Sequence, residues 1–396
     1  MPRFEPFRGL RYDPERVDLA DVMAPPYDVI DEEERSLLEA KSPYNAVRVE
    51  LPRDATGHDR YEEARCLLEQ WRQEGVVTVD EEPSFYVYRM GFIDTGGRAR
   101  QTSGVIGALG LEAAGGDVLP HEHTTAKPKD DRLNMLRSCR ANLSPIWGLS
   151  LSEGLSGLCE LPGPPDSRAT DDQGVHHRLW RVHQSGVVQA ISEAVSATPV
   201  MIADGHHRYE TGLAYRDEQR AAGAGEGAHD LIMALIVELA EDQLAVRPIH
   251  RLLRGTPPAD ELLAAWQEHF DPFETGPADE TLDARMADAE ALALVTTEGT
   301  WLLRPRAGAF PGVADLDSAR LERALGTRPD VETTFQHGTD TAIGAVAKGD
   351  ADAAVLLRPA SVAAIAATAR ARDKMPPKTT FFHPKPRTGI VFRPLD

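Results

Sequence analysis

The residues best suited to carry out chemistry form a short run in the middle of the chain. Asp204-Gly205-His206-His207-Arg208 follows the apolar segment 198–203 and precedes a helical pattern that ends near residue 222. Free N–H groups and the positive end of the helix dipole attract anions at a helix start, and glycine lets a ligand approach the backbone closely. Arg208 can add paired, charge-assisted hydrogen bonds to phosphate oxygens. The run therefore predicts a phosphate-binding turn formed by Gly205, His206, His207 and Arg208.

Asp204 needs a different role, because its carboxylate repels a bare phosphate. We expect it to face a metal ion, a hydroxyl group or one of the histidines. The alternative interpretation is structural: Asp204 caps the helix, His206 and His207 lie on the surface, and Arg208 forms a salt bridge. Two adjacent histidines and an arginine directly after a buried-looking strand favour the functional interpretation.

A second polar segment, from His121 to Arg132, is dense in acids, bases and cations and has no apolar period. Glu122 could act as a general base or as a metal-bound carboxylate. Lys127, Lys129 or Arg132 could neutralise phosphate charge. The alternative is a solvated charged loop.

A third segment, residues 374–389, is rich in prolines that hold the backbone extended. Its cationic side chains could complete the anion site: Lys378, His383, Lys385 and Arg387. The alternative is a proline-rich tail before a last strand at residues 390–392.

Standard metal and nucleotide signatures are missing from the sequence. His121 and His123 would point the same way on a strand, but no H-E-x-x-H or zinc-type cysteine spacing occurs. The sequence also lacks the P-loop, the dinucleotide-binding glycine pattern and the G-x-S-x-G elbow. We therefore expect no tightly held zinc.

Composition limits the class of protein. The net charge of −20 repels the nucleic acid backbone, so general DNA binding is disfavoured. Cys66, Cys139 and Cys159 show no C-x-x-C spacing, which suits a reducing compartment. The N-terminus lacks the apolar core of a signal peptide, and the longest apolar run, 231–237, is too short to cross a bilayer. We expect a cytoplasmic protein with no membrane partner; its oligomeric state is not predicted.

The elements that must position these residues follow an α/β (α+β) pattern. Asp31 can cap a helix that buries Leu37 and Leu38, and further helices are expected at about 58–74 and 131–139. A β-hairpin is expected at 85–111 around the turn 94–97. The Gly-, Pro- and Ser-rich stretch 154–174 is expected to be an exposed linker. We predict three segments: an N-terminal α/β segment (1–115), a core with the phosphate-binding loop (116–255) and a C-terminal α/β domain (256–396).

Four motifs together resemble a widespread bacterial family labelled domain of unknown function 1015. They are Ala-Pro-Pro-Tyr-Asp-Val-Ile at 24–30, His-Glu-His-Thr at 121–124, Asp-Gly-His-His-Arg-Tyr-Glu at 204–210 and Met-Pro-Pro-Lys-Thr-Thr-Phe-Phe-His-Pro-Lys at 375–385. Their order spans nearly the whole chain. The family label itself implies no activity.

The Asp-Gly-His-His-Arg turn is also similar to the phosphate-binding turn of the ParB and sulfiredoxin superfamily, which implies a ParB/sulfiredoxin-like nucleotide-binding core. Sulfiredoxin has a catalytic cysteine where this chain has His206 or His207, and the partition proteins add a basic helix-turn-helix region that this acidic chain lacks. The free serine kinases carry a similar turn.

That resemblance implies a small-molecule kinase that transfers phosphate from ATP or ADP to a hydroxylated metabolite, with free L-serine the first substrate to test. Mg²⁺ would bridge the phosphates, and Asp204 or Glu122 would bind the metal or accept the hydroxyl proton. Tyr27, Asp28 and Lys378 are candidates for the substrate pocket. The alternatives are a non-catalytic nucleotide- or phosphometabolite-binding regulator and a nucleotide hydrolase or nuclease.

Overall fold

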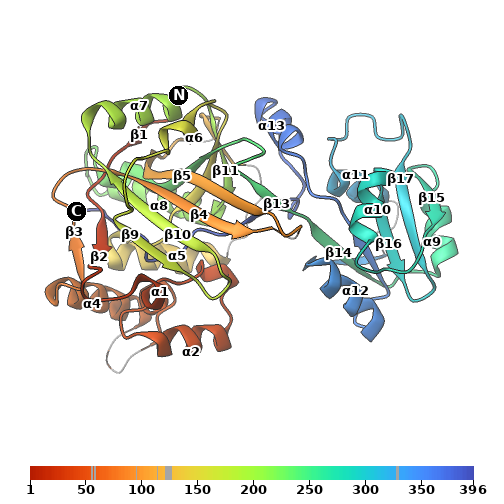
Figure 1. The fold of residues 1–396 in the computed structure, drawn as a ribbon, viewed down its shortest axis with the longest axis horizontal. Coiled ribbons are helices and arrows are strands. Elements are labelled where there is room, and N and C mark those ends of the chain that lie inside the picture. The colour runs from red at the N-terminus through yellow and green to blue at the C-terminus, as the bar shows by residue number, and fades with distance from the viewer. Residues whose placement is uncertain (55–56, 58, 95, 114, 121–126, 327–329) are drawn as a thin grey trace. The chain divides into compact units, whose positions relative to one another are not determined.

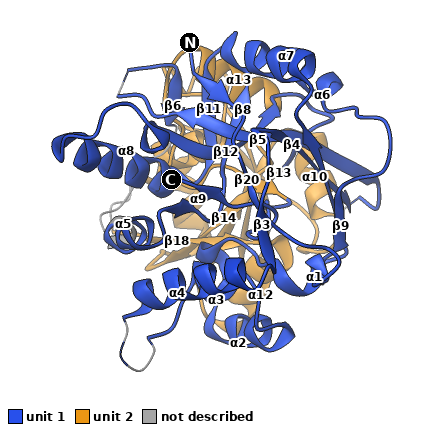
Figure 2. Cartoon of the chain, turned by 90° about the vertical axis from the view of Figure 1, so that its left-hand side faces the viewer, with its two compact units in different colours: residues 1–245, 384–396 blue, residues 246–383 orange. Residues whose placement is uncertain are grey.

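The computed structural model describes residues 1–54, 57, 59–94, 96–113, 115–120, 127–326 and 330–396 (Figure 1). The chain divides into two compact units. Unit 1 combines Met1–Ala245 with the C-terminal segment Pro384–Asp396, and unit 2 comprises Val246–His383 (Figure 2). This differs from the three predicted segments, because one sheet of unit 1 contains strands from both sides of residue 115.

A mixed nine-stranded sheet forms the centre of unit 1, in the order β6-β11-β8-β12-β5-β4-β10-β9, with β1 paired to β5. The pairs β11/β6 and β12/β8 are parallel. The pairs β11/β8, β12/β5, β5/β4, β4/β10 and β10/β9 are antiparallel. The strands are β1 (Phe4–Glu5), β4 (Phe85–Ile93), β5 (Ala99–Gly110), β6 (Val118–Pro120), β8 (Ile146–Ser150), β9 (Ser167–Thr170), β10 (His176–Val182), β11 (Val200–Asp204) and β12 (Leu231–Glu238).

Eight α-helices, two 3-10 helices (η1, Tyr27–Val29, and η2, Ala228–Asp230) and two small sheets complete the described part of unit 1. The helices are α1 (Leu19–Val22), α2 (Glu32–Lys41), α3 (Val47–Glu50), α4 (Arg60–Gln73), α5 (Lys127–Cys139), α6 (Leu155–Leu158), α7 (Ser185–Ser196) and α8 (His206–Ala221). The small sheets pair β2 (Leu10–Tyr12) with β3 (Val77–Val79) and β7 (Ala141–Asn142) with β21 (Arg393–Pro394). Helices α6 and α7 cover one side of the central sheet, whereas α4 and α5 lie on the other (Figures 1 and 2). Helix α8 packs on α5, and α5 packs on α4.

Several local predictions are confirmed. Asp31 caps α2, with its side chain accepting from the N–H of Glu34. The predicted hairpin is the antiparallel pair β4/β5. The stretch 154–174, in contrast, is not a linker: it contains α6 and β9, and β9 pairs with β10 inside unit 1. Its many turn-forming residues occupy the bends between these short elements.

Unit 2 contains an antiparallel six-stranded sheet in the order β15-β17-β16-β19-β14-β18. Its strands are β14 (Ile249–Arg254), β15 (Phe270–Glu274), β16 (Leu292–Thr296), β17 (Thr300–Pro305), β18 (Glu332–His337) and β19 (Ala353–Leu356). Its helices are α9 (Ala259–Trp266), α10 (Leu282–Ala289), α11 (Asp317–Leu325), α12 (Thr339–Lys348) and α13 (Val362–Arg370). A small sheet pairs β13 (Ala245–Arg247) with β20 (Phe381–His383). Both units mix helices with sheets, as the α/β prediction requires.

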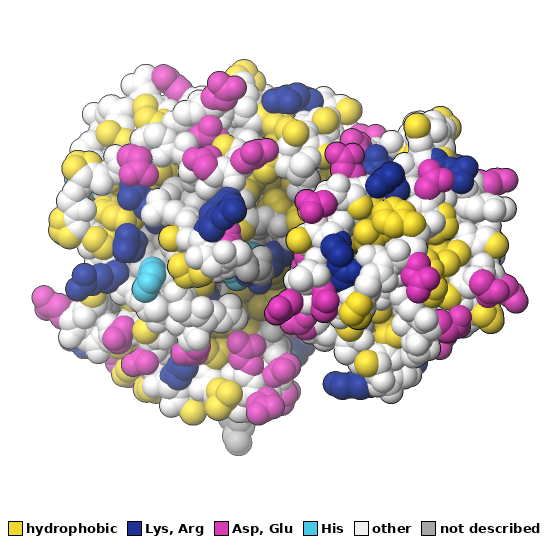
Figure 3. Space-filling view, turned by 45° about the vertical axis from the view of Figure 1, so that its right-hand side comes forward, with side chains coloured by type: hydrophobic (Ala, Val, Ile, Leu, Met, Phe, Trp, Pro, Cys, Tyr) yellow, Lys and Arg dark blue, Asp and Glu magenta, His cyan; other side chains and the backbone are white. Residues whose placement is uncertain are grey.

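Charged side chains are dispersed on the face shown in Figure 3, where Asp and Glu alternate with Lys and Arg and no continuous basic stripe is visible. Among the helices that the structure describes, none combines the length and apolar character needed to cross a bilayer.

Candidate functional site

The Asp204–Arg208 loop joins an inner strand of the unit 1 sheet to a long helix. β11 lies between β6 and β8, and its first four residues are buried. Gly205 follows in the left-handed region with φ +88° and is the N-cap of α8. As a glycine, it provides no side-chain cap for the helix. The first-turn N–H groups of α8 therefore have no side-chain acceptor from the N-cap, because Gly205 has none to offer.

The alternative interpretation of this loop as a simple capped helix is wrong in two respects. Asp204 is the last residue of the strand and does not cap the helix. His206 does not lie on the surface, because only 8% of it is exposed. The salt bridge that this interpretation expects is present, since Arg208 forms an ion pair with Asp204.

Both carboxylate oxygens of Asp204 contact cations. Lys385 Nζ donates to Oδ1, and Arg208 Nη2 donates to Oδ2 at 3.0 Å. Burial works to raise the pKa of Asp204, but the charges of Lys385 and Arg208 outweigh it and lower that pKa below its ordinary value. An ionised, doubly paired carboxylate accepts a proton poorly. The arrangement favours a role in holding the two cations over the predicted roles of proton acceptor or metal ligand.

Arg208 is fixed on three sides. Nη1 donates to Ser144 Oγ at 3.1 Å and to the Pro145 carbonyl at 2.5 Å, while Nη2 donates to Asp204. Nε is buried without a hydrogen-bond partner among the described residues. The guanidinium lies beside Gly205, because a Cβ there would stand 3.0 Å from Nε and Nη2. Glycine is therefore required both for the positive φ and for the approach of Arg208 to the helix start.

Tyr27, from the predicted substrate pocket, lies next to this arginine although 181 residues separate them in the chain. Its ring centroid is 4.4 Å from the guanidinium carbon of Arg132 and 5.9 Å from that of Arg208. Burial raises the pKa of Tyr27, against the opposing effect of the two arginines. Asp28 is exposed beside it. The structure thus brings the motif at 24–30 to the loop at 204–208.

The structure does not place the other predicted site residues, Glu122 and Lys378, beside the loop at 204–208. Glu122, like His121 and His123, lies outside the described residues. Lys378 belongs to unit 2, whereas the loop belongs to unit 1. In the described part of the chain, no three His, Cys, Asp or Glu residues gather in a way that could hold a metal ion.

The predicted cationic patch at 374–389 is divided between partners. Lys385 pairs with Asp204, and Arg387 pairs with Asp171. Both residues come from the C-terminal segment that returns to unit 1. Arg132 neutralises Glu50 and Asp131, and its side chain is only 8% exposed. The predicted role of Arg132 as a phosphate contact is therefore replaced by a structural one.

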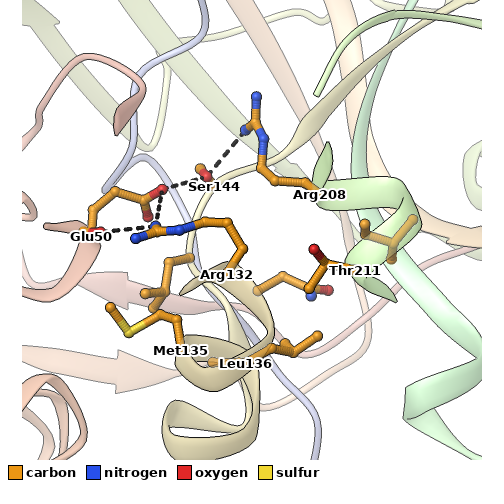
Figure 4. A pocket seen from close by; sticks show the side chains of 11 residues that line it. Glu50, Arg132, Met135, Leu136, Ser144, Arg208 and Thr211 are labelled. Carbon is orange, nitrogen blue, oxygen red and sulfur yellow. Dashed lines mark hydrogen bonds and ion pairs between the residues drawn. The ribbon is translucent and has the colours of Figure 1, made fainter. Parts of the chain in front are cut away.

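A small cavity, which the sequence did not indicate, lies below the first turn of α8. Its volume is about 50 Å³, and its polar lining includes Glu50, Arg132, Ser144, Arg208 and Thr211 (Figure 4). Nucleotide-sized pockets measure roughly 300 Å³ or more, so this cavity cannot hold a nucleotide. Gly205 and His207 are half-buried, so part of the loop is open to solvent.

A larger hollow of about 410 Å³, lined by residues 12, 14–19, 167 and 168, contains none of the predicted site residues.

Comparison with known proteins gives a family and several distant structural likenesses. Similar solved structures include a conserved hypothetical protein from Pyrococcus furiosus (13% identity, TM-score 0.37, covering 69% of this chain and 90% of that chain). SbnI with C-terminal truncation from Staphylococcus aureus is similar at 11% identity and TM-score 0.39, covering 72% of this chain and 85% of that chain. A free serine kinase in complex with AMP is similar at 14% identity and TM-score 0.36, covering 67% of this chain and 83% of that chain.

At these values, activity has to be argued from the geometry of this chain. No curated protein matches the sequence. The model of the family described as Protein of unknown function (DUF1015) matches residues 4–319, and the chain therefore belongs to that family.

Proposed function

We propose that this chain is a small-molecule phosphotransferase in which the phosphates of ATP or ADP bind at the start of α8. The observation that carries the proposal is the state of the loop: α8 begins without a side-chain cap, and the buried Nε of Arg208 has no partner among the described residues. Oriented N–H donors at a helix start and an arginine beside them form an anion site.

Each part of the loop has a role in this proposal. Gly205 brings the backbone close to the phosphates, and His206, His207 and Arg208 supply first-turn N–H groups. Asp204 and Lys385 hold Arg208 in place, so that little reorganisation is needed when the ligand binds. Tyr27 and Asp28 would face the acceptor. Free L-serine remains the first acceptor to test.

Mg²⁺ bound together with the nucleotide would neutralise phosphate charge. The loop fits a bound metal ion only in part, because both carboxylate oxygens of Asp204 already accept hydrogen bonds from Lys385 and Arg208. The metal would therefore be held mainly by the phosphates, with Glu122 as the proposed carboxylate ligand or proton acceptor. Lys385 and Arg208 would remain with Asp204.

A second candidate, a non-catalytic nucleotide-binding regulator, has a specific observation in its favour. The carboxylate of the loop is locked in ion pairs, which leaves Asp204 unsuited to proton abstraction. Phosphorus NMR of the protein with ATP, Mg²⁺ and a pool of hydroxylated metabolites separates the candidates. A new phosphomonoester supports the transferase, inorganic phosphate alone indicates hydrolysis, and unchanged ATP favours the regulator.

Binding is tested with calorimetry on ADP and ATP. Arg208→Ala should weaken nucleotide affinity by about 1.5 to 3 kcal/mol, the range for hydrogen bonds to charged groups. Arg216→Ala is the matched control: Arg216 is a buried arginine of the same helix whose partners are Asp217 and the Leu111 carbonyl. It should lower stability and leave affinity unchanged. If the wild-type protein binds neither nucleotide at millimolar concentration, the proposed function is wrong.

A further inference from the structure

The cavity below α8 contains polar atoms that lack partners although they are buried. Glu50 is 2% exposed and its Oε2 has no hydrogen-bond partner among the described residues, as is true of Thr211 Oγ1. Thr211 comes from α8 and Glu50 from the end of α3, and both line the cavity (Figure 4). Leaving such groups unsatisfied is costly, so the cavity has to supply what the protein does not.

The polar groups of the cavity indicate water as its content. Of the charged residues that line it, Arg132 pairs with Glu50, and Arg208 pairs with Asp204. Each guanidinium group therefore already has a carboxylate partner. A volume of about 50 Å³ exceeds what one water molecule needs, and Glu50 Oε2 and Thr211 Oγ1 offer it an acceptor and a hydroxyl.

The other carboxylate oxygen of Glu50 leads directly to the anion site. Ser144 Oγ donates to Glu50 Oε1 at 3.0 Å and accepts from Arg208 Nη1 at 3.1 Å. One hydroxyl can do both, since it has one donor and two lone pairs. Arg132 Nη1 also holds Glu50, by donating to its backbone carbonyl at 2.9 Å. Glu50, Ser144 and Arg208 therefore form a continuous buried chain (Figure 4).

We propose that Glu50 is a positioning residue for the nucleotide site, acting through Ser144 to fix the guanidinium of Arg208 and, through buried water, to anchor the first turns of α8. The inference rests on the proposed function, because it takes Arg208 as a phosphate contact. The proposed effect is on the orientation of the Arg208 guanidinium. An arginine with five donors can serve a ligand only if the remaining donors point to it, and the Ser144 bond helps to select that rotamer.

The test is a double-mutant cycle on ADP affinity, measured by calorimetry with melting temperature recorded in parallel. Ser144→Ala should weaken ADP binding by about fivefold to tenfold in the wild-type background, the size of one lost hydrogen bond. In the Arg208→Ala background it should have no further effect, because its route to the ligand is gone. Glu50→Gln should weaken binding similarly and should not add to Ser144→Ala.

Ser150→Ala is the matched control. Ser150 is fully buried at the other end of β8, and its hydroxyl also makes two hydrogen bonds, with Thr198 and with the N–H of Ser152. It should lower the melting temperature as Ser144→Ala does and leave ADP affinity within about twofold. If Glu50→Gln fails to fold, Glu50→Asp takes its place: it keeps the charge, shortens the reach to Ser144 and should also weaken binding.

The outcomes separate the two proposals. Wild-type protein that does not bind ADP overturns the proposed function and the inference with it. Wild-type protein that binds ADP, with Ser144→Ala acting by the same factor in both backgrounds or not at all, overturns only the positioning role. A loss confined to the background that retains Arg208 supports it, since a general packing defect would act in both.

Discussion

Unit 1 contains two buried charged clusters that resemble each other in composition and differ in how completely they are satisfied. In the first, the Asp171 cluster, Asp171 Oδ1 accepts the N–H groups of Gln173 and Val175, both at 2.9 Å. Its Oδ2 accepts from Arg387 Nε at 2.9 Å and from His177 Nε2 at 3.1 Å. Because a carboxylate only accepts, Nε2 carries the proton, and Nδ1 accepts from the Tyr88 hydroxyl at 2.7 Å.

The second, the Asp204 cluster, consists of Glu50, Ser144, Asp204, Arg208 and Lys385. It also joins distant segments through ion pairs, yet it leaves Arg208 Nε and Glu50 Oε2 without partners among the described residues. None of the four side chains of the Asp171 cluster has such an atom. The comparison teaches that buried charge alone does not indicate a ligand site. The proposed function instead requires unused donor capacity beside a half-buried loop, because a network whose hydrogen bonds are all made has none left for a ligand.

The largest expected effect tests the closed cluster. Asp171→Ala removes the partner of Arg387, which is 9% exposed, and of His177, which is 1% exposed. Removing one partner of a buried pair leaves an uncompensated charge, so the free energy of unfolding should fall by about 3 to 5 kcal/mol. Urea unfolding measures the loss. ADP affinity of the folded fraction should stay unchanged.

Asp172→Ala is the control for this variant, because Asp172 is the next residue and its side chain is 77% exposed in an ion pair with Lys41. Surface pairs contribute about 0 to 1 kcal/mol, so little change is expected. Equal losses in the two variants would contradict the distinction between a buried cluster and a surface pair. A loss of ADP binding in Asp171→Ala would contradict the proposal that nucleotide binding depends on the Asp204 cluster and not on the Asp171 cluster.

A smaller effect is expected from Gly205→Ala, paired with Gly154→Ala. Both glycines are helix N-caps in the left-handed region, with φ +88° and +91°. Each alanine should cost about 1 to 2 kcal/mol of stability for that conformation. A Cβ at Gly154 meets nothing within 4 Å, whereas one at Gly205 stands 3.0 Å from Arg208 Nε and Nη2.

Only Gly205→Ala should therefore move the guanidinium. Its ADP affinity should fall by about tenfold, and that of Gly154→Ala should not change. Calorimetry on both variants isolates the displacement of Arg208 from backbone strain. Equal affinities would show that the position of Arg208 does not determine nucleotide binding.

The local elements of the site could be predicted from the sequence, since their signals lie within a few residues. The apolar run before Asp204 and the helical spacing after it gave β11 and α8, and alternation around the turn at 94–97 gave the β4/β5 hairpin. The linker prediction for 154–174 failed because bends between short, packed elements have the same composition as an exposed connection.

The assembly of the site could not be predicted, because its bonds join residues far apart in sequence. Lys385 and Asp204 are 181 residues apart, and Ser144 and Glu50 are 94 apart. Nothing near Glu50 marks it as buried, since Val47-Arg48-Val49-Glu50 alternates like a half-exposed strand and is instead a short helix. The return of Pro384–Asp396 to unit 1 likewise depends on long-range pairing, such as the bridge between Leu10 and Phe392.

The smallest expected effect is a dependence of stability on pH that comes from the closed cluster. Burial lowers the pKa of His177 despite the opposing effect of Asp171. The unfolded chain binds a proton at this histidine near pH 6.5, while the folded chain resists it. Its contribution to stability is therefore present above about pH 6.5 and is lost as pH falls toward the lowered folded-state pKa.

The pKa of Asp171 is also lowered, because hydrogen bonds from His177 and Arg387 outweigh the effect of burial. Its contribution is present above the ordinary aspartate value of about 3.9 and is lost only in stronger acid. The interval from pH 7 to 5 therefore isolates His177. In urea unfolding across this interval, the stability difference between wild type and His177→Gln should shrink as pH falls, since only the wild type has this group to titrate. Both proteins contain the other histidines, so the contributions of those histidines cancel in the stability difference. They include buried His250, whose pKa is lowered to about 4. A difference that stays constant would show that His177 does not titrate on unfolding in this range, and the Asp171 cluster would then be less closed to protons than its hydrogen bonds imply.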